Sequence, residues 1–380
     1  MKILVVEQYA KDAANYSIDL VNYLSNNNEV VLACPKVIDK YLENKEYGFN
    51  IKYLYNNSFQ GGILRKVFDY YISTKKLLKY IKKQKFDVVH LQWFSLPWIE
   101  YYFVKKIKKY SKLVITCHDV TAFNLRFKEE KYLKKIYYQA DAVLVHKDNN
   151  KKQFIEKYGF KDNVYSIPDG LFNEKDFVIL DKEESKNKLG IPLDKVVFSS
   201  IGKYRESKGI DILIKAFGIV SKQYDDAFLL IAGDFSKADK EYYNNLFLEN
   251  TSKTNSKLML SYVELDKMPL YYAATDYSVL SYKNIYQSGV MQTSLFYQKA
   301  LILSNLENFR DGIDGNGYFF ESENVDSLVE IMKKAIIEKN NIKEKEENSK
   351  KLAHSRFDSL LRVKETEKIY YELCEKGAKY

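Results

Sequence analysis

The 380-residue chain has few of the residues that build disulfide frameworks and metal sites. Its three cysteines lie far apart and show no CxxC spacing, which argues against paired disulfides and against a structural zinc site. The four histidines form no HExxH motif, and the sequence contains no DxD motif. Fifteen glycines and five prolines are too few for a collagen-like or low-complexity chain. We therefore expect a globular protein without a metal or other cofactor, with its cysteines buried as apolar side chains.

A long apolar run is also missing. The nearest is residues 88–104, which His90, Gln92, Pro97 and Glu100 interrupt, whereas a membrane-spanning helix requires about 18 to 20 apolar residues. At the N-terminus, one lysine precedes an apolar stretch that is too short for a secretory signal and indicates a first strand instead. These features predict a cytoplasmic protein.

Positive charge is in excess in the first part of the chain. The net charge is +9; residues 1–170 hold 29 Lys and Arg against 18 Asp and Glu, and the remainder holds 31 against 33. The excess forms three lysine clusters interleaved with Tyr and Phe: Lys75, Lys76, Lys79, Lys82, Lys83 and Lys85; Lys105, Lys106, Lys108 and Lys109; and Lys128, Lys131, Lys134 and Lys135. Two interpretations remain open: the clusters are solvated helix faces, or they attract an anionic surface. Because the clusters lack Arg and no nucleic-acid motif accompanies them, acidic lipid headgroups are favoured over nucleic acid.

Short apolar runs alternate with longer amphipathic segments. Phe68 with Tyr71 and Ile72, and Leu78 with Ile81, are three or four residues apart, which indicates a helix between two such runs. Runs that are apolar throughout suit parallel strands covered by helices on both faces, so the predicted fold class is α/β. The predicted strands are 3–6, 30–33, 51–54, 88–91, 113–117, 142–145, 164–167, 196–202, 228–233, 258–262, 277–280 and 300–304.

A break divides this alternation into two domains. Pro168, Gly170 and Pro192, with a charged patch between them, predict a linker. The predicted division is 1–170 for the first domain, 171–194 for the linker, 195–356 for the second domain and 357–374 for a final helix.

Loops after strands are the candidate sites, because ligands of parallel sheets bind beyond the carboxyl ends of the strands. His118 and Asp119 follow the predicted strand 113–117 directly. A lone histidine at a strand end is commonly a structural residue, but an acidic neighbour at this edge also suits a binding role, and both interpretations stay open.

The loop after the strand 196–202 carries three cations. Gly202 ends the strand, Lys203, Arg205 and Lys208 follow, and a helix begins near Gly209. Arg offers a rigid fork, Lys a point charge and the helix start free N–H groups, so this arrangement suits phosphate. A solvated basic loop would explain one such cation more easily than three.

A further loop precedes an apolar helix. Gln287, Ser288 and Gly289 are small or polar residues that let the backbone approach a ligand, and a helix N-terminus favours an anion. The glycine-dense stretch 311–320 is interpreted as a turn before a short strand.

The order of these motifs resembles the retaining nucleotide-sugar glycosyltransferases of family four. The resemblance rests on Thr116-Cys117-His118-Asp119, the strand from Ala140, IPDG at 167–170, GKYRESKG at 202–209, LLIAGD at 229–234 and the segment 262–280. It implies the GT-B fold, in which two Rossmann-like domains with parallel sheets face each other across a cleft. The first domain would bind the acceptor and be completed by the C-terminal helix, and the second would bind the donor. LQWFSLPW at 91–98 and Ser288-Gly289 resemble a subgroup that builds bacterial surface polysaccharides.

The resemblance also assigns residues to roles. His118 would touch the donor sugar or the acceptor, with Asp119 as its companion. Arg205 and Lys208 would bind the donor diphosphate, with Lys203 an alternative to Arg205. The remaining donor-binding assignments are Gly202, Tyr286, Gln287, Ser288, Gly289, Val290 and Ser294.

Two departures from the family pattern are visible. Many members carry two glutamates eight residues apart in the donor site, where this chain has Tyr286 and Ser294. The glycine-rich loop after the first strand is replaced by a segment without glycine, residues 7–16.

The implied activity is metal-independent, retaining transfer of a sugar from a nucleoside-diphosphate sugar to a saccharide or lipid-linked saccharide. The cations would stabilise charge on the departing phosphate in the transition state. Such an acceptor would place the enzyme peripherally at the inner face of the cell membrane, with no nucleic-acid partner. The alternatives are a catalytically silent sugar-nucleotide-binding subunit and a sugar-nucleotide epimerase of the same fold.

Overall fold

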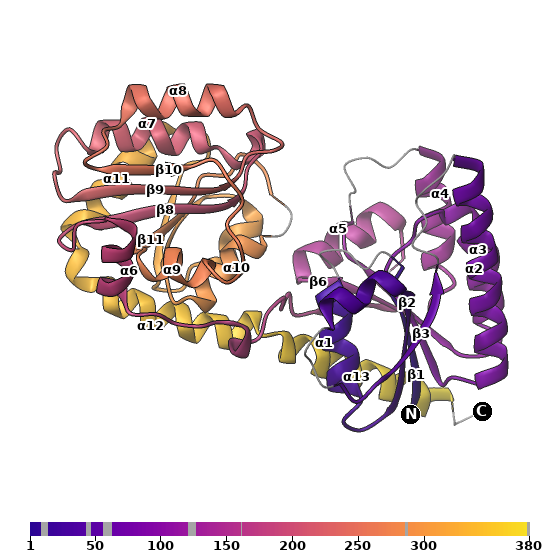
Figure 1. The fold of residues 1–380 in the computed structure, drawn as a ribbon. Coiled ribbons are helices and arrows are strands. Elements are labelled where there is room, and N and C mark those ends of the chain that lie inside the picture. Colours follow the sequence, from indigo (N-terminus) through magenta and orange to yellow (C-terminus); the bar gives the residue numbers. More distant parts are fainter. Residues whose placement is uncertain are drawn as a thin grey trace. The chain divides into compact units, whose positions relative to one another are not determined.

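The computed structural model describes residues 1–8, 14–42, 47–55, 63–120, 127–160, 162–285 and 288–377 (Figure 1). The chain divides into two compact units. Unit 1 comprises Met1–Gly170 together with Ser359–Tyr380, and unit 2 comprises Leu171–Asp358. Each unit is built on one parallel sheet with helices on both faces, which confirms the predicted α/β class.

Unit 1 has a seven-stranded sheet in the order β3-β2-β1-β4-β5-β6-β7. Its strands are β1 Lys2–Val6, β2 Glu29–Pro35, β3 Asn50–Tyr55, β4 Val88–Leu91, β5 Lys112–Cys117, β6 Ala142–His146 and β7 Val164–Ile167. The strand order reverses between β1 and β4, which makes the carboxyl edge there a switch point where α/β sheets bind ligands. All seven strands predicted in this part of the chain are present.

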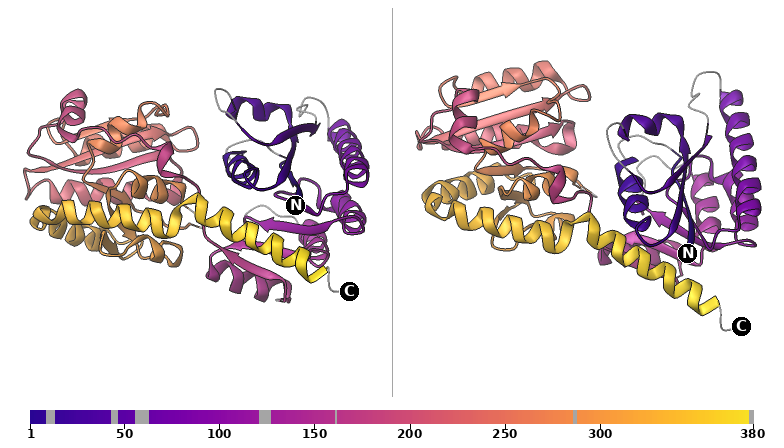
Figure 2. Two further views of the ribbon diagram at one scale, coloured as in Figure 1. Left: turned by 90° about the horizontal axis from the view of Figure 1, so that it is seen from below. Right: turned by 60° about the horizontal axis from the view of Figure 1, so that its bottom comes forward.

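Helices cover both faces of this sheet. They are α1 Ala14–Leu24, α2 Ile63–Gln84, α3 Pro97–Ile107, α4 Phe127–Tyr137, α5 Asp148–Tyr158 and α13 Ser359–Gly377. Helices α2 to α5 pack on one face, and α1 and α13 pack on the other. Along β1, Leu4 and Val6 enter the first core and Ile3 and Val5 the second, which explains why the strand is apolar throughout from Ile3 to Val6. Figure 2 shows α13 in yellow, leading to the chain end marked C.

Unit 2 has a six-stranded sheet in the order β10-β9-β8-β11-β12-β13. Its strands are β8 Val196–Lys203, β9 Ala227–Asp234, β10 Ser256–Met259, β11 Tyr277–Leu280, β12 Ala300–Ser304 and β13 Gly317–Phe320. The strand predicted at 258–262 begins and ends earlier, because pairing with β9 runs from Ser256 opposite Leu229 to Met259 opposite Ala232. An edge strand is fixed by its single neighbour, and the apolar run alone placed it too late.

The helices of unit 2 are α6 Lys182–Leu189, α7 Ile210–Val220, α8 Lys240–Asn250, α9 Met268–Ala273, α10 Gly289–Phe296, α11 Val325–Ile337 and α12 Ile342–Leu352. Helices α7, α8 and α11 share one core with the sheet. Helices α6, α9, α10 and α12 pack on the opposite face. Of the three cysteines, Cys34 and Cys117 are buried and Cys374 is half-buried, and none forms a disulfide.

The segment 171–194, predicted as a linker, instead belongs to unit 2 and contains α6. Its charges have partners. Lys182 and Lys186 both pair with the buried carboxylate of Asp276, which also accepts a hydrogen bond from the N–H of Val197 (2.8 Å). Leu189 enters the core. A charged sequence therefore folds here because its cations meet a buried counter-charge.

Replacing Asp276 by Asn is expected to destabilise unit 2, because the buried ammonium of Lys186 loses its counter-charge. Removing one partner of a buried pair costs about 3 to 5 kcal/mol, and an exposed pair contributes under about 1 kcal/mol. Lys188→Ala, which removes the exposed pair with Glu184 (2.6 Å), is the matched control. Urea unfolding followed by circular dichroism should show a lower midpoint for D276N and little change for K188A; equal midpoints would contradict this role.

Candidate functional site

The cations predicted after β8 lie on the short segment between β8 and α7. Lys203 and Arg205 are exposed, whereas Lys208 is half-buried. Gly209 follows with φ 59°, and a Cβ atom there would lie 1.9 Å from the carbonyl oxygen of Ser281. Only glycine fits this position. The cationic segment is therefore packed directly against the chain that follows β11.

Lys208 lies on an aromatic ring. Its Nζ is 3.6 Å from the centroid of the Tyr282 ring, which is a cation–π contact, and Tyr282 is 3% exposed. Desolvation, and secondly the charge of Arg205, lower the pKa of Lys208 to about 7. At neutral pH Lys208 is therefore protonated about half of the time. A bound anion would favour the protonated, charged form.

The N-terminus of α10 lies beside the same ring. The Ser288 side chain lies near the Tyr282 hydroxyl and offsets part of the rise that burial causes in the pKa of Tyr282, and Ser288 caps the helix by accepting a hydrogen bond from the N–H of Met291 (3.1 Å). The N–H groups of Gly289 and Val290 belong to the first turn, where no intrahelical acceptor exists. These two N–H groups are donors that an anion can use.

Further contacts join the two loops. The Ser281 hydroxyl donates to the carbonyl of Gly209 (2.7 Å), and the N–H of Lys283 donates to the carbonyl of Ser207 (2.9 Å). At the end of β8, a Cβ atom on Gly202 would meet Val290 at 3.2 Å. Of the predicted donor-binding residues, the structure thus brings together the cationic segment, Gly202 and the start of α10. This arrangement can bind a diphosphate.

Three of the predicted donor-binding residues are not part of the described arrangement. Tyr286 and Gln287 fall outside the described residues. Ser294 is fully buried, and its hydroxyl oxygen lies 2.8 Å from both the hydroxyl of Ser278 and the carbonyl oxygen of Val290. Its side chain packs between helix and sheet, and its assignment to the donor site stays a prediction.

His118 lies in unit 1, at the carboxyl end of β5. Its ring stacks on Trp93 (centroids 4.0 Å apart, planes at 9°) and meets the Tyr16 ring edge-on at 4.8 Å. Its Nε2 is 3.2 Å from Oε1 of Gln92. Burial, and secondly the neighbouring His146, lower the pKa of His118 well below its ordinary value. A neutral, partly exposed imidazole at this edge can exchange hydrogen bonds with a hydroxyl group.

Asp119, the predicted companion of His118, is exposed. Its backbone carbonyl oxygen lies 3.6 Å from the Cys117 sulfur. The structure thus gives Asp119 a surface position next to the histidine, open to solvent.

Sequence reasoning missed several residues of both regions. Tyr282 lies two residues after β11, and Trp93 lies two residues after β4. The rule that ligands bind in the loops after strands could therefore have pointed to both. Tyr16 and Arg362 come from α1 and α13, far apart in the sequence, and no local pattern indicates their meeting.

No three histidine, cysteine, aspartate or glutamate side chains within the described ranges are grouped so that they could hold a metal ion. The expectation of metal independence stays a prediction. Within the same ranges, no helix is both long and apolar enough to cross a bilayer.

Two family models match the chain, and the boundary between them lies close to the boundary between unit 1 and unit 2. Residues 13–172 match the model of Glycosyltransferase Family 4, and residues 181–353 match that of glycosyl transferases group 1. Two glycosyltransferase models thus match the chain one after the other, and its fold is that of the GT-B glycosyltransferases. The resemblance seen in the sequence is confirmed at that level.

This glycosyltransferase is similar in fold to a solved glycosyltransferase of Rickettsia africae, with TM-score 0.77 and 18% identity over 98% of both chains. It is also similar to HepE of Anabaena, solved with UDP and glucose, with TM-score 0.72 and 16% identity over 100% of both chains. An uncharacterized glycosyltransferase of Methanocaldococcus jannaschii is 30% identical over 193 residues, 47% of each chain. The match thus spans about half the length of that relative.

The affinity of unit 2 for pyrophosphate is expected to fall as the pH rises above 7. Lys208 has a pKa of about 7 in the free site, and a bound anion raises it, so the charged form that binds is lost with rising pH. Calorimetry in two buffers of different ionisation enthalpy should show proton uptake on binding near pH 8. Lys208→Met should abolish the uptake, and Lys222→Ala, beyond the far end of α7, should retain it. Binding without proton uptake would contradict this assignment.

Proposed function

We propose that this glycosyltransferase transfers a sugar from a nucleoside-diphosphate sugar to a saccharide or lipid-linked saccharide acceptor. The observation that carries the proposal is the seat of Lys208 on Tyr282, beside Arg205 and the N-terminus of α10. Cations and free N–H groups gathered in this way suit a diphosphate. HepE of Anabaena, solved with UDP and glucose, supports a nucleotide sugar as the donor.

The proposed chemistry follows from charge. When the anomeric C–O bond breaks, the nucleoside diphosphate leaves with the bonding electrons and gains negative charge. Lys208, Arg205 and the N–H groups of α10 stabilise that charge more in the transition state than in the bound substrate. In our proposal they take the place of a divalent metal, the acceptor attacks from the face that the phosphate leaves, and the leaving phosphate takes its proton.

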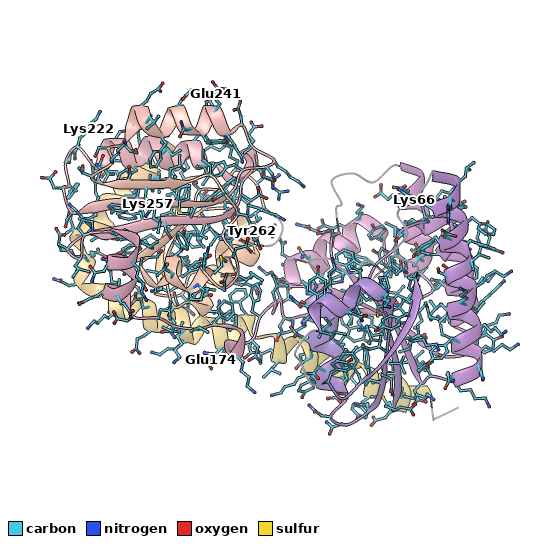
Figure 3. The ribbon with its side chains drawn as sticks, in the orientation of Figure 1. Lys66, Glu174, Lys222, Glu241, Lys257 and Tyr262 are labelled. Carbon is cyan, nitrogen blue, oxygen red and sulfur yellow. The ribbon has the colours of Figure 1, made fainter. Side chains whose placement is uncertain are left out.

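Lys208→Ala is expected to lower kcat by about 100- to 1000-fold, the typical effect of removing one preorganised group from a developing negative charge. Lys222→Ala, labelled in Figure 3, is the matched control, because it removes an exposed lysine beyond the opposite end of α7. Turnover is measured with a panel of UDP-, GDP- and dTDP-sugars in the presence of EDTA. Undiminished transfer by K208A would remove Lys208 from the mechanism.

A catalytically silent sugar-nucleotide-binding subunit is the second candidate. The observation in its favour is that Ser294, which replaces a family carboxylate, is buried and uncharged. Calorimetry and transfer assays with the same panel separate the two. Binding without hydrolysis or transfer would favour the silent subunit, and turnover would favour the enzyme.

For the acceptor side we propose peripheral attachment of unit 1 to an anionic membrane. One stripe of exposed side chains, spaced by three or four residues, runs along α2: Leu64, Phe68, Tyr71, Lys75, Lys79 and Lys82. The stripe is apolar in the first half of the helix and cationic in the second. On α3, which packs against α2, Trp98 and Tyr102 likewise precede Lys105 and Lys106. Figure 3 shows these helices fringed by side chains, with Lys66 labelled in the first turn of α2.

The chain direction of α2 and α3 determines at which edge of the sheet their apolar ends lie. Both helices connect parallel strands and so return antiparallel to them, which brings their N-terminal halves to the carboxyl edge of the sheet. That edge also carries His118. Rings at the level of the headgroups and lysines against anionic phosphates would hold this edge toward a lipid-linked acceptor.

Flotation with vesicles should recover more protein with anionic than with neutral phosphatidylcholine lipids, and less at high salt. The double variant Leu64→Ser with Phe68→Ser should lose recovery. Leu248→Ser, which removes an exposed leucine of α8 in unit 2 (60% exposed), is the control and should not. Equal recovery with both lipids would leave the lysines as solvated helix faces.

A further inference from the structure

Arg362 is a buried cation of unit 1 without a counter-charge. It lies on α13 with 1% of its surface exposed. Its Nη1 donates to the backbone carbonyl of Tyr16 (3.3 Å). Its Nε and Nη2 find no hydrogen-bond acceptor within the ranges the structure describes, and no carboxylate there forms an ion pair with it. A buried guanidinium in this state is unusual, because burial of an unpaired charge is unfavourable.

The Tyr16 ring connects this cation to the candidate site. The guanidinium carbon lies 3.5 Å from the centroid of the ring. The same ring meets the rings of His118 at 4.8 Å and of His146 at 5.5 Å, both edge-on. Trp93 stacks directly on the His118 ring and so fixes the plane of the imidazole. Trp93 thus contacts His118 directly, and Arg362 acts on it through the Tyr16 ring.

The hydrogen bonds of Gln92 set the tautomer of His118. Oε1 of Gln92 accepts from Nε2–H of His118 (3.2 Å), and the Nε2 amide of Gln92 lies 3.3 Å from Nδ1 of His90. Because Nε2 carries the proton, Nδ1 of a neutral His118 is an acceptor. Within the described residues no donor is bonded to it.

We propose that Arg362 is a positioning residue: through Tyr16 it holds His118 as a neutral imidazole whose Nδ1 accepts a hydrogen bond from a hydroxyl group of a sugar substrate. The inference rests on the proposed function for the identity of that hydroxyl. Burial already disfavours the charged imidazole, and the guanidinium adds repulsion, because a second positive charge beside a buried cation is disfavoured. A neutral imidazole accepts from a hydroxyl, whereas an imidazolium can only donate.

The surroundings of His118 act in the same direction. Desolvation comes first in lowering the pKa of His118, followed by His146, Arg362 and His90. The pKa values of His90 and His146 are also lowered by burial, with Arg362 contributing to each.

Three further charged groups lie close to this cluster, namely Asp169, Lys147 and Asp119. Asp169, which raises the pKa of His146, is paired with Lys147 at 3.5 Å, and Asp119 is exposed. Asp169 is thus paired with a lysine, and among the described residues no carboxylate forms an ion pair with Arg362.

The test is a titration of the imidazole groups by ¹H–¹⁵N correlation NMR on the full chain labelled with ¹⁵N-histidine. The chain has only four histidines, and His118→Gln assigns the signal. In the wild type, His118 should stay neutral, with the proton on Nε2, from pH 8 down to 5.5. Arg362→Met should raise its pKa by about one unit or more, and Arg362→Lys, which keeps the charge, should leave it unchanged.

Three results would overturn the inference: a wild-type His118 that titrates near its ordinary pKa, a proton on Nδ1 instead of Nε2, or no change of pKa in folded R362M. The first two need no variant, so the inference stays testable even where R362M fails to fold.

A second readout uses the rate. In sugar transfer, the acid limb of kcat/KM should move to higher pH in R362M and stay in place in R362K, which a merely structural role of Arg362 would not produce. The NMR titration requires no substrate, so it decides the state of His118 even if transfer is never detected. Conversely, transfer by a protein whose His118 titrates normally would overturn this inference and leave the proposed function standing.

Discussion

The contact between Lys208 and Tyr282 determines the charge of the candidate site in unit 2. A lysine beside Arg205 would ordinarily extend into solvent, away from the like charge. Here the buried ring draws the ammonium to 3.6 Å and partly desolvates it, so the cation is close to losing its proton. A doubly charged anion beside Lys208 would raise the pKa of the lysine again, because its negative charge stabilises the partly desolvated ammonium. The charge of Lys208 thus depends on a tyrosine that itself carries no charge.

The two units treat charge in opposite ways at the carboxyl edges of their sheets. Unit 2 gathers cations and free N–H groups, which suit an anion. Unit 1 surrounds His118 with aromatic rings and buries Arg362 behind them, and burial followed by neighbouring positive charge lowers the pKa values of His118 and His90. A neutral edge suits hydroxyl groups and an electropositive edge suits phosphates, and a nucleotide sugar and its acceptor carry both.

Much of the fold was predictable because parallel strands buried on both faces must be apolar throughout. Strands such as 88–91, 164–167 and 277–280 were predicted residue for residue. The three cations after β8 were predictable because their charge density in a short loop is unusual. The partners were not: Tyr282 reads as one more tyrosine among 33, and Arg362 meets Tyr16 only through tertiary packing. Helix α6 was missed because its cations are stabilised by Asp276, a residue that lies far along the chain.

The chain order of unit 1 bears on how the protein is made. Helix α13 supplies Val363, Tyr370 and Arg362 to unit 1, yet the ribosome synthesises it after the whole of unit 2. During translation, the face of the first sheet that α13 covers is therefore open to solvent while the second sheet is already complete. The nascent polypeptide exposes Ile3, Val5 and their neighbours until α13 emerges, so unit 1 is completed only after unit 2 has been synthesised.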